Sequence, residues 1–135
     1  MALIVWDQKL ETGHGKIDEQ HKSLVEIINR LHGAMKQGKG KDELGGILVF
    51  LKDYTVSHFA MEEQLMAQHS YSGAVQHKAI HAALVMQVAD LVDQFQQGKA
   101  TLTLPVMNFL EDWLVKHIQG EDYKFALELR GKGVH

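Results

Sequence analysis

The sequence predicts an all-α protein, an antiparallel up-down-up-down four-helix bundle preceded by an N-terminal arm. Three observations lead to this fold class. The 135 residues contain a single proline, Pro105, so long uninterrupted helices are possible. Apolar residues recur at steps of three and four in four separate segments. The segments between them are short, and short connections join antiparallel neighbours in helix bundles.

The first expected helix covers residues 18–37 and follows the arm, residues 1–16. Asp18 can cap its N-terminus, and Gly38 and Gly40 can close it as C-terminal glycine caps. Its core-facing stripe alternates steps of three and four. The stripe consists of His21, Leu24, Ile28, Leu31 and Met35.

The second and third helices are expected over residues 42–68 and 72–97. Asp42 can cap the second helix, and a serine of the turn Ser70-Tyr71-Ser72-Gly73 can cap the third. Their stripes include Leu48, Leu51, Thr55, His58 and Glu62, then His77, His81, Leu84, Val88 and Phe95.

The fourth helix is expected over residues 103–130. Thr101 or Thr103 can cap it, and Pro105 is tolerated in the first turn. Its stripe consists of Val106, Leu110, Trp113 and His117. No linker or low-complexity tract interrupts the pattern, so we expect residues 1–135 to form one domain.

The composition excludes several classes of protein. The formal net charge is −3 without a basic stripe, so nothing favours nucleic acid as a partner. There is no cysteine, which excludes disulfides, iron–sulfur clusters and thiolate metal sites and fits a reducing compartment. No apolar run approaches membrane length. We therefore expect a cytoplasmic protein without a membrane span, and we expect it to be a monomer.

Nine histidines are many for this length, and their spacing is informative. Each predicted helix carries polar groups on its apolar stripe, where leucine would be expected. Residues four apart on a helix project from one face, so each pair can reach one ion or two adjacent ions. The groups are His21, His58-x-x-x-Glu62, His77-x-x-x-His81 and His117-x-x-x-x-Asp122.

A metal centre explains this pattern better than core packing does. Any one such pair arises often by chance, and a single buried histidine is more often a hydrogen-bonded core residue. Together, however, five imidazoles and two carboxylates could make only a few mutual hydrogen bonds, and burying them unpaired would be costly. Imidazole and carboxylate ligands without thiolate favour iron, manganese or zinc.

The last motif predicts a local irregularity of the fourth helix. His117 and Asp122 are five residues apart, whereas a regular helix brings residues four apart onto one face. A single extra residue is typical of a π-bulge, and such bulges occur frequently at functional sites. We expect a wide turn within residues 117–122, which Gly120 would ease.

The order of these motifs along the chain resembles the ligand signature of the hemerythrin family, in particular its bacterial members. The likeness covers nearly the whole chain, including the tryptophan of the N-terminal arm. The long stretch between His81 and His117 also resembles the bacterial branch rather than the shorter animal proteins. The resemblance implies reversible binding of dioxygen at a non-haem centre of two iron ions (Fe2+/Fe3+) bridged by an oxo or hydroxo group.

Carried onto this sequence, the resemblance implies a role for each ligand. His77, His81 and His117 would bind one iron, His21 and His58 would bind the other, and Glu62 and Asp122 would bridge the two. The second iron would then be one ligand short, and dioxygen would bind there. The residues expected to form the oxygen pocket are Leu24, Phe59, Trp113, Leu114 and Ile118. The histidines not expected to be ligands are His14, His32, His69 and His135.

Other functions remain open on the sequence alone. Oxygen-activating di-iron bundles use about four carboxylates with two Glu-x-x-His repeats, which the ligands here lack, so a carrier is favoured over an oxygenase. The protein would store oxygen or deliver it to an oxygen-consuming enzyme, with at most weak peroxidase-type activity. The alternatives are an oxygen or redox sensor acting with a separate partner, and a di-iron peroxidase or nitric-oxide-handling enzyme. Metal storage is poorly served by two ions per chain.

Overall fold

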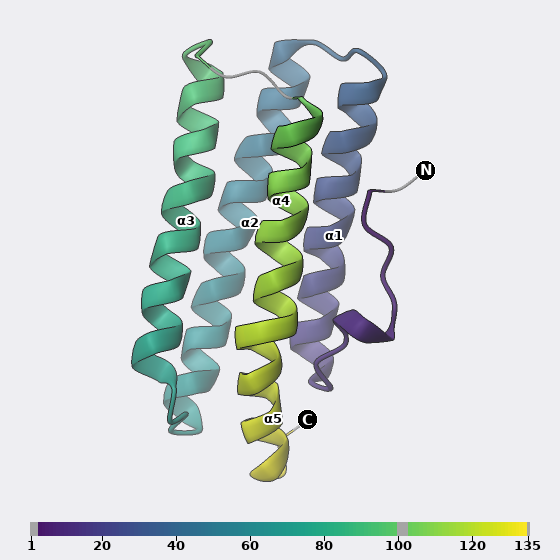
Figure 1. Cartoon of the computed structure of the whole chain (residues 1–135). Coiled ribbons are helices and arrows are strands. Elements are labelled where there is room, and N and C mark those ends of the chain that lie inside the picture. The colour runs from purple at the N-terminus through teal and green to yellow at the C-terminus, as the bar shows by residue number, and fades with distance from the viewer. Residues whose placement is uncertain (1–2, 100–102, 135) are drawn as a thin grey trace.

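The computed structural model describes residues 3–99 and 103–134, and these form the antiparallel up-down-up-down four-helix bundle that the sequence predicts (Figure 1). A short 3₁₀ helix, η1 (Gln8–Leu10), lies in the N-terminal arm. The long elements are α1 (Gly15–Lys36), α2 (Lys41–Gln68), α3 (Ala74–Gln96) and α4 (Leu104–His117). The fourth helix continues through a π-helical turn, η2 (Ile118–Asp122), into α5 (Tyr123–Gly131).

The starts of the helices differ from the predicted caps. α1 begins at Gly15, where Nδ1 of the cap residue His14 accepts from the Ile17 N–H at 3.3 Å. The Asp18 carboxylate is not the cap, because it accepts from the Thr12 N–H and hydroxyl at 2.8 and 2.7 Å. Asp42 likewise lies within the first turn of α2.

Two glycines near the helix ends have different roles from each other. Gly38 ends α1 in the left-handed region, at φ +71°, and the following residue donates to the Ala34 carbonyl at 3.1 Å. This is the predicted C-terminal glycine cap. Gly40, by contrast, is extended at φ −72° and is the cap residue of α2, so it does not close α1.

The third and fourth helices also start without the predicted side-chain caps. Gly73 is the cap residue of α3, because the Ser72 hydroxyl and N–H instead bond to the Glu128 carboxylate at 2.5 and 3.0 Å. Thr103 occupies the cap position of α4 but makes no side-chain cap bond, and Pro105 lies in the first turn. Thr101 lies outside the described residues.

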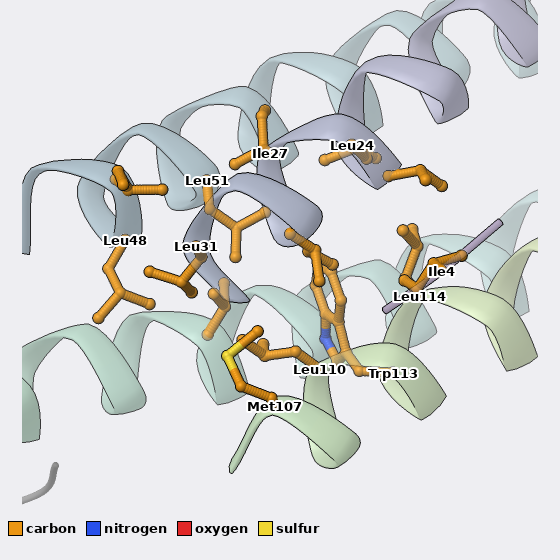
Figure 2. Packing of buried hydrophobic residues seen from close by; sticks show 14 of the residues in the cluster. Ile4, Leu24, Ile27, Leu31, Leu48, Leu51, Met107, Leu110, Trp113 and Leu114 are labelled. Atoms are coloured by element: carbon orange, nitrogen blue, oxygen red, sulfur yellow. The ribbon is translucent and has the colours of Figure 1, made fainter. Parts of the chain in front are cut away.

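Buried apolar side chains form two clusters at different heights of the bundle. The larger cluster packs α1, α2, α3 and α4 together and includes Leu31, Leu48 and Leu110 (Figure 2). The smaller cluster consists of Ile17, Met66, Phe125 and Leu129. On α4, Met107 is fully buried whereas the expected Val106 is half-buried, because Met107 lies one turn before Leu110 on the face directed into the larger cluster. The polar stripe residues lie between the two clusters along the helices.

The N-terminal arm is fastened to the bundle near this polar layer. Asn29 of α1 makes two hydrogen bonds of 2.8 Å with the backbone N–H and carbonyl of Ile4. Arg130 of α5 donates to the Thr12 carbonyl at 2.9 Å. η1 packs against η2, and Leu10 is buried in the larger cluster. The arm therefore covers the seam between α1 and the fourth helix.

Across the described residues, no helix combines the length and the apolar composition that crossing a membrane requires.

Gly13 connects the arm to α1 at a position where a side chain is strained. Its φ is +95°, and a Cβ would meet Nη2 of Arg130 at 1.9 Å. We predict that Gly13→Ala lowers the free energy of unfolding by about 1–2 kcal/mol, because an L-residue is strained at positive φ. Urea unfolding measures this.

The matched control is Gly33→Ala in α1, where a Cβ would meet nothing within 4 Å. This variant should gain roughly 0.5–1 kcal/mol, because alanine loses less conformational entropy than glycine in a helix. Equal stability of the two variants would contradict this interpretation of Gly13.

Candidate metal centre

A layer of seven buried polar side chains crosses the middle of the bundle. Every helix of the bundle contributes to it, at the positions where the sequence places histidine or carboxylate on the core stripe. The structure brings together all seven predicted metal ligands. They are His21 from α1, His58 and Glu62 from α2, His77 and His81 from α3, His117 from α4 and Asp122 from η2.

The donor atoms form two groups that share both carboxylates. One group contains three histidines and the other two, and within each group the donor atoms lie within 4.8 Å of one another. The three-histidine group is Glu62, His77, His81, His117 and Asp122, and the two-histidine group is His21, His58, Glu62 and Asp122. This arrangement suits two adjacent cations bridged by two carboxylates.

The histidine rings direct Nε2 toward the carboxylates. Asp122 lies 2.7 Å from Nε2 of His21 and 3.0 Å from Nε2 of both His77 and His117. Glu62 lies 3.2 Å from Nε2 of His58 and 3.3 Å from Nε2 of His81. Nε2 is therefore the common inward-facing donor atom of all five imidazoles.

Most of these short contacts lack the alignment of a hydrogen bond. Among the described residues, both Glu62 oxygens and Nε2 of His21, His58, His81 and His117 are buried without a hydrogen-bond partner. Each unsatisfied buried group costs about 1–3 kcal/mol. Cations among these atoms would satisfy all of them, so the residues fit a pair of metal ions.

Burial also holds two of the imidazoles, those of His58 and His81, in the form that binds metals. It lowers the pKa of His58 to about 3, with His21 adding to the shift, and that of His81 to about 2, with His77 adding to it. These rings are therefore neutral near pH 7, and neutral imidazole is the metal-binding form.

The two carboxylates are shifted in opposite directions. Burial, together with the nearby Asp122, raises the pKa of Glu62 well above its usual range. Burial would also raise the pKa of Asp122, but the adjacent His117 and contacts from His117, His21 and His77 hold it well below its usual range. Two carboxylates this close resist ionising together, and bound cations would relieve that repulsion.

Two residues outside the predicted set orient the histidine rings. Nδ1 of His58 lies 2.7 Å from Oε1 of Gln20, and Nδ1 of His81 lies 3.0 Å from Oε2 of Glu63. With Nδ1 donating to these oxygens, the Nε2 lone pair is free to bind a metal. Sequence periodicity missed Gln20 and Glu63 because neither lies on a core stripe. Each directly neighbours a predicted ligand along the chain, which was the only available signal.

The predicted wide turn is confirmed, because Ile118–Asp122 forms a π-helical turn. It allows His117 and Asp122 to enter the same layer although five residues separate them. No neighbouring atom of the described residues requires a glycine at position 120, since a Cβ there would meet nothing within 4 Å.

A small cavity of about 10 Å³ adjoins the two-histidine group. This is close to the smallest space that holds one water molecule. Predicted pocket residues Leu24, Phe59, Trp113 and Leu114 line it, as does Leu84, which the sequence did not indicate as a pocket residue. Ile118 is buried in the same apolar cluster, one turn from Leu114, but does not line the cavity.

The other described histidines lie outside both donor groups. His14 caps α1, and His69 ends α2. His32 is buried, and that burial, followed by the charge of Lys36, lowers its pKa. His135 lies outside the described residues.

A buried layer of histidines and carboxylates inside a four-helix bundle defines a class of cation-binding proteins. The family profile described as the Hemerythrin HHE cation binding domain matches residues 12–128. A bacteriohemerythrin of Pseudomonas aeruginosa is 40% identical over 130 residues, which are 96% of this chain and 84% of that protein. A bacteriohemerythrin of Methylococcus capsulatus is 38% identical over 123 residues, which are 90% of this chain and 93% of that protein.

A crystal structure of wild-type hemerythrin matches this fold with a TM-score of 0.87 at 36% identity. The match covers 93% of this chain and 96% of that one. The chain belongs to the hemerythrin family. The family resemblance inferred from the ligand spacing is therefore confirmed.

Metal removal should destabilise the bundle. We predict that the chelated protein melts at least about 10 °C below the metal-loaded protein, because several buried donors lose their partners together. Differential scanning calorimetry before chelation, after chelation and after reloading measures the difference. Melting curves that coincide within error would show that the donors do not depend on metal.

Proposed function

We propose that this protein binds dioxygen reversibly at a centre of two iron ions held by the seven buried donors. His77, His81 and His117 would hold one iron, and His21 and His58 the other. Glu62 and Asp122 would bridge them. The iron pair, when bound, supplies the electrons that dioxygen accepts and releases again. Membership of the hemerythrin family supports this assignment.

The observation that carries the proposal is the asymmetry of the two donor groups. The iron beside His21 and His58 would have one histidine fewer than its neighbour, and the small cavity lies at that group. An open coordination position beside a cavity is what a ligand-binding metal requires. The cavity is also small enough to favour a diatomic molecule.

The cavity walls would protect bound dioxygen from water. Leu24, Phe59 and Leu114 are all nearly inaccessible to solvent and present carbon atoms to the cavity. Excluding water from such a site prevents side reactions such as proton leakage. The ring of Phe59 also stacks on that of His81, with centroids 3.8 Å apart and planes 3° apart, which restricts movement of both rings.

The ligand set favours a carrier over an oxygenase. Di-iron bundles that activate oxygen use about four carboxylates, whereas this layer has two carboxylates and five imidazoles. Neutral imidazoles donate less negative charge, so high-valent iron is less accessible. We further propose that the protein is a cytoplasmic monomer, and that it stores oxygen or delivers it to an oxygen-consuming enzyme. The absence of cysteine is compatible with a reducing compartment.

An optical oxygen cycle tests the proposal. Reduced, iron-loaded protein should develop a visible absorption band on exposure to air, lose it under argon and regain it in later cycles. His21→Ala should abolish this cycle because it removes a donor beside the cavity. The matched control is His32→Ala, which truncates a buried histidine of the same helix outside the donor groups and should preserve it. A spectrum that changes irreversibly in the first cycle would exclude a carrier.

Leu114 should restrain loss of the ferrous state. Leu114→Ala removes several carbon atoms from the cavity wall and opens room for solvent. We predict that this variant still binds two irons and dioxygen but oxidises to the ferric form severalfold faster than the parent. The decay of the oxygenated spectrum under air measures the rate.

Leu110→Ala is the matched control. Leu110 lies one turn earlier on α4 and is fully buried, but it does not line the cavity. Both truncations should lower stability by about 2–5 kcal/mol. Only Leu114→Ala should accelerate oxidation, and equal oxidation rates in the two variants would assign Leu114 to core packing alone.

A further inference from the structure

The seam between α3 and α4 is the loosest of the bundle. Among the described residues, α2 packs closely against both α1 and α3, and α1 contacts α4, whereas α3 and α4 approach each other less closely. An open groove of about 460 Å³ runs along this seam. Ile80 and Phe109 give it apolar walls, and Lys116 and Asp112 contribute charge.

Only a thin partition separates this groove from the cavity beside the two-histidine group. Leu84, Trp113 and His117 line both spaces, so their side chains form the shared wall. Trp113 and His117 each retain 7% exposure, and Leu84 is half-buried. Elsewhere the cavity is closed more tightly, since Leu24 and His58 are each 1% exposed and Leu114 is 3% exposed.

One hydrogen bond joins α3 and α4 at this shared wall. Nε1 of Trp113 on α4 donates to the Leu84 carbonyl on α3 at 3.2 Å. Within residues 3–99 and 103–134, this is the one hydrogen bond that the indole nitrogen makes. On the other side of α4, the buried Ile4 of the arm lies beside Leu114 and covers the seam between α1 and α4 (Figure 2). The groove therefore shares part of its wall with the cavity, which places an opening to solvent next to it.

We propose that dioxygen reaches the cavity through the α3–α4 groove and that the Trp113 ring gates this route, held closed by its bond to the Leu84 carbonyl. This proposal rests on the proposed oxygen-binding function. Dioxygen is small and apolar, so it can move along the apolar Ile80 and Phe109 walls of the groove and needs only a brief displacement of the Trp113 ring to pass. Bulk water stays outside the cavity whenever the Trp113 ring returns to the position in which it bonds to Leu84.

Trp113→Phe separates gating from packing, because phenylalanine keeps an aromatic ring but cannot donate to Leu84. Oxygen association and dissociation rate constants, measured by stopped flow, should both rise severalfold while their ratio changes little. The matched control is Trp6→Phe, which alters the only other tryptophan and should leave both constants unchanged. Unchanged rate constants in Trp113→Phe, whatever its melting temperature, would contradict the proposal that Trp113 is a gate.

A second readout does not depend on iron. In the Trp6→Phe background Trp113 is the only tryptophan, so its fluorescence reports on the groove. Zinc-loaded protein of this background is exposed to increasing dissolved oxygen. Dissolved oxygen quenches the Trp113 fluorescence, and the quenching constant measures its access to the ring. Adding Ile80→Phe narrows the groove without altering a cavity residue, so it should reduce this constant at least twofold. An unchanged constant would exclude the groove as the route.

The two measurements separate failure of the gate from failure of the proposed function. If the chain bound no oxygen, the optical cycle would fail while the zinc-loaded quenching experiment would still give its result. If the optical cycle succeeded but neither Trp113→Phe nor Ile80→Phe changed its readout, oxygen binding would stand and the gate would be rejected.

Discussion

Two carboxylates buried side by side among five imidazoles impose the constraint on which the rest of this structure depends. Glu62 and Asp122 are fully buried, and most of the donor atoms around them lack hydrogen bonds. Such a layer is unfavourable inside a protein unless cations compensate it. Long helices with few interruptions are one way to hold these groups in register, because each helix delivers donors at fixed spacing. The apolar clusters at two heights of the bundle supply the stability that the polar layer does not.

The fourth helix shows how the backbone adapts to this constraint. A regular helix would place Glu121, not Asp122, one turn after His117. The π-helical turn instead brings Asp122 among His21, His77 and His117. The arm helix η1 packs against this turn, and Arg130 fastens the arm just beyond it. The local irregularity is thus supported by contacts that a plain bundle would not need.

Much of this arrangement could be predicted because it follows helical periodicity. The seven donors, the π-helical turn and the direction of each helix all follow from spacing along the chain. The side-chain caps of the first and third helices could not be predicted in this way. Asp18 binds Thr12 of the arm and Ser72 binds Glu128 of α5, in preference to their own helix ends. Gln20 and Glu63 were missed, and Leu84 was predicted only as a core residue, for a related reason. Each acts across the bundle on a residue of another helix, and periodicity within one helix carries no information about that.

Two adjacent cation sites share both carboxylates but differ in their number of histidines, and one cavity lies beside the site with fewer histidines. We propose that the seven donors hold two irons together, and iron content tests this proposal most directly. Protein produced with adequate iron should contain two iron atoms per chain by elemental analysis, and replacing Asp122 by alanine should lower this number. One tightly bound metal per chain, or zinc alone at full occupancy, would contradict the account.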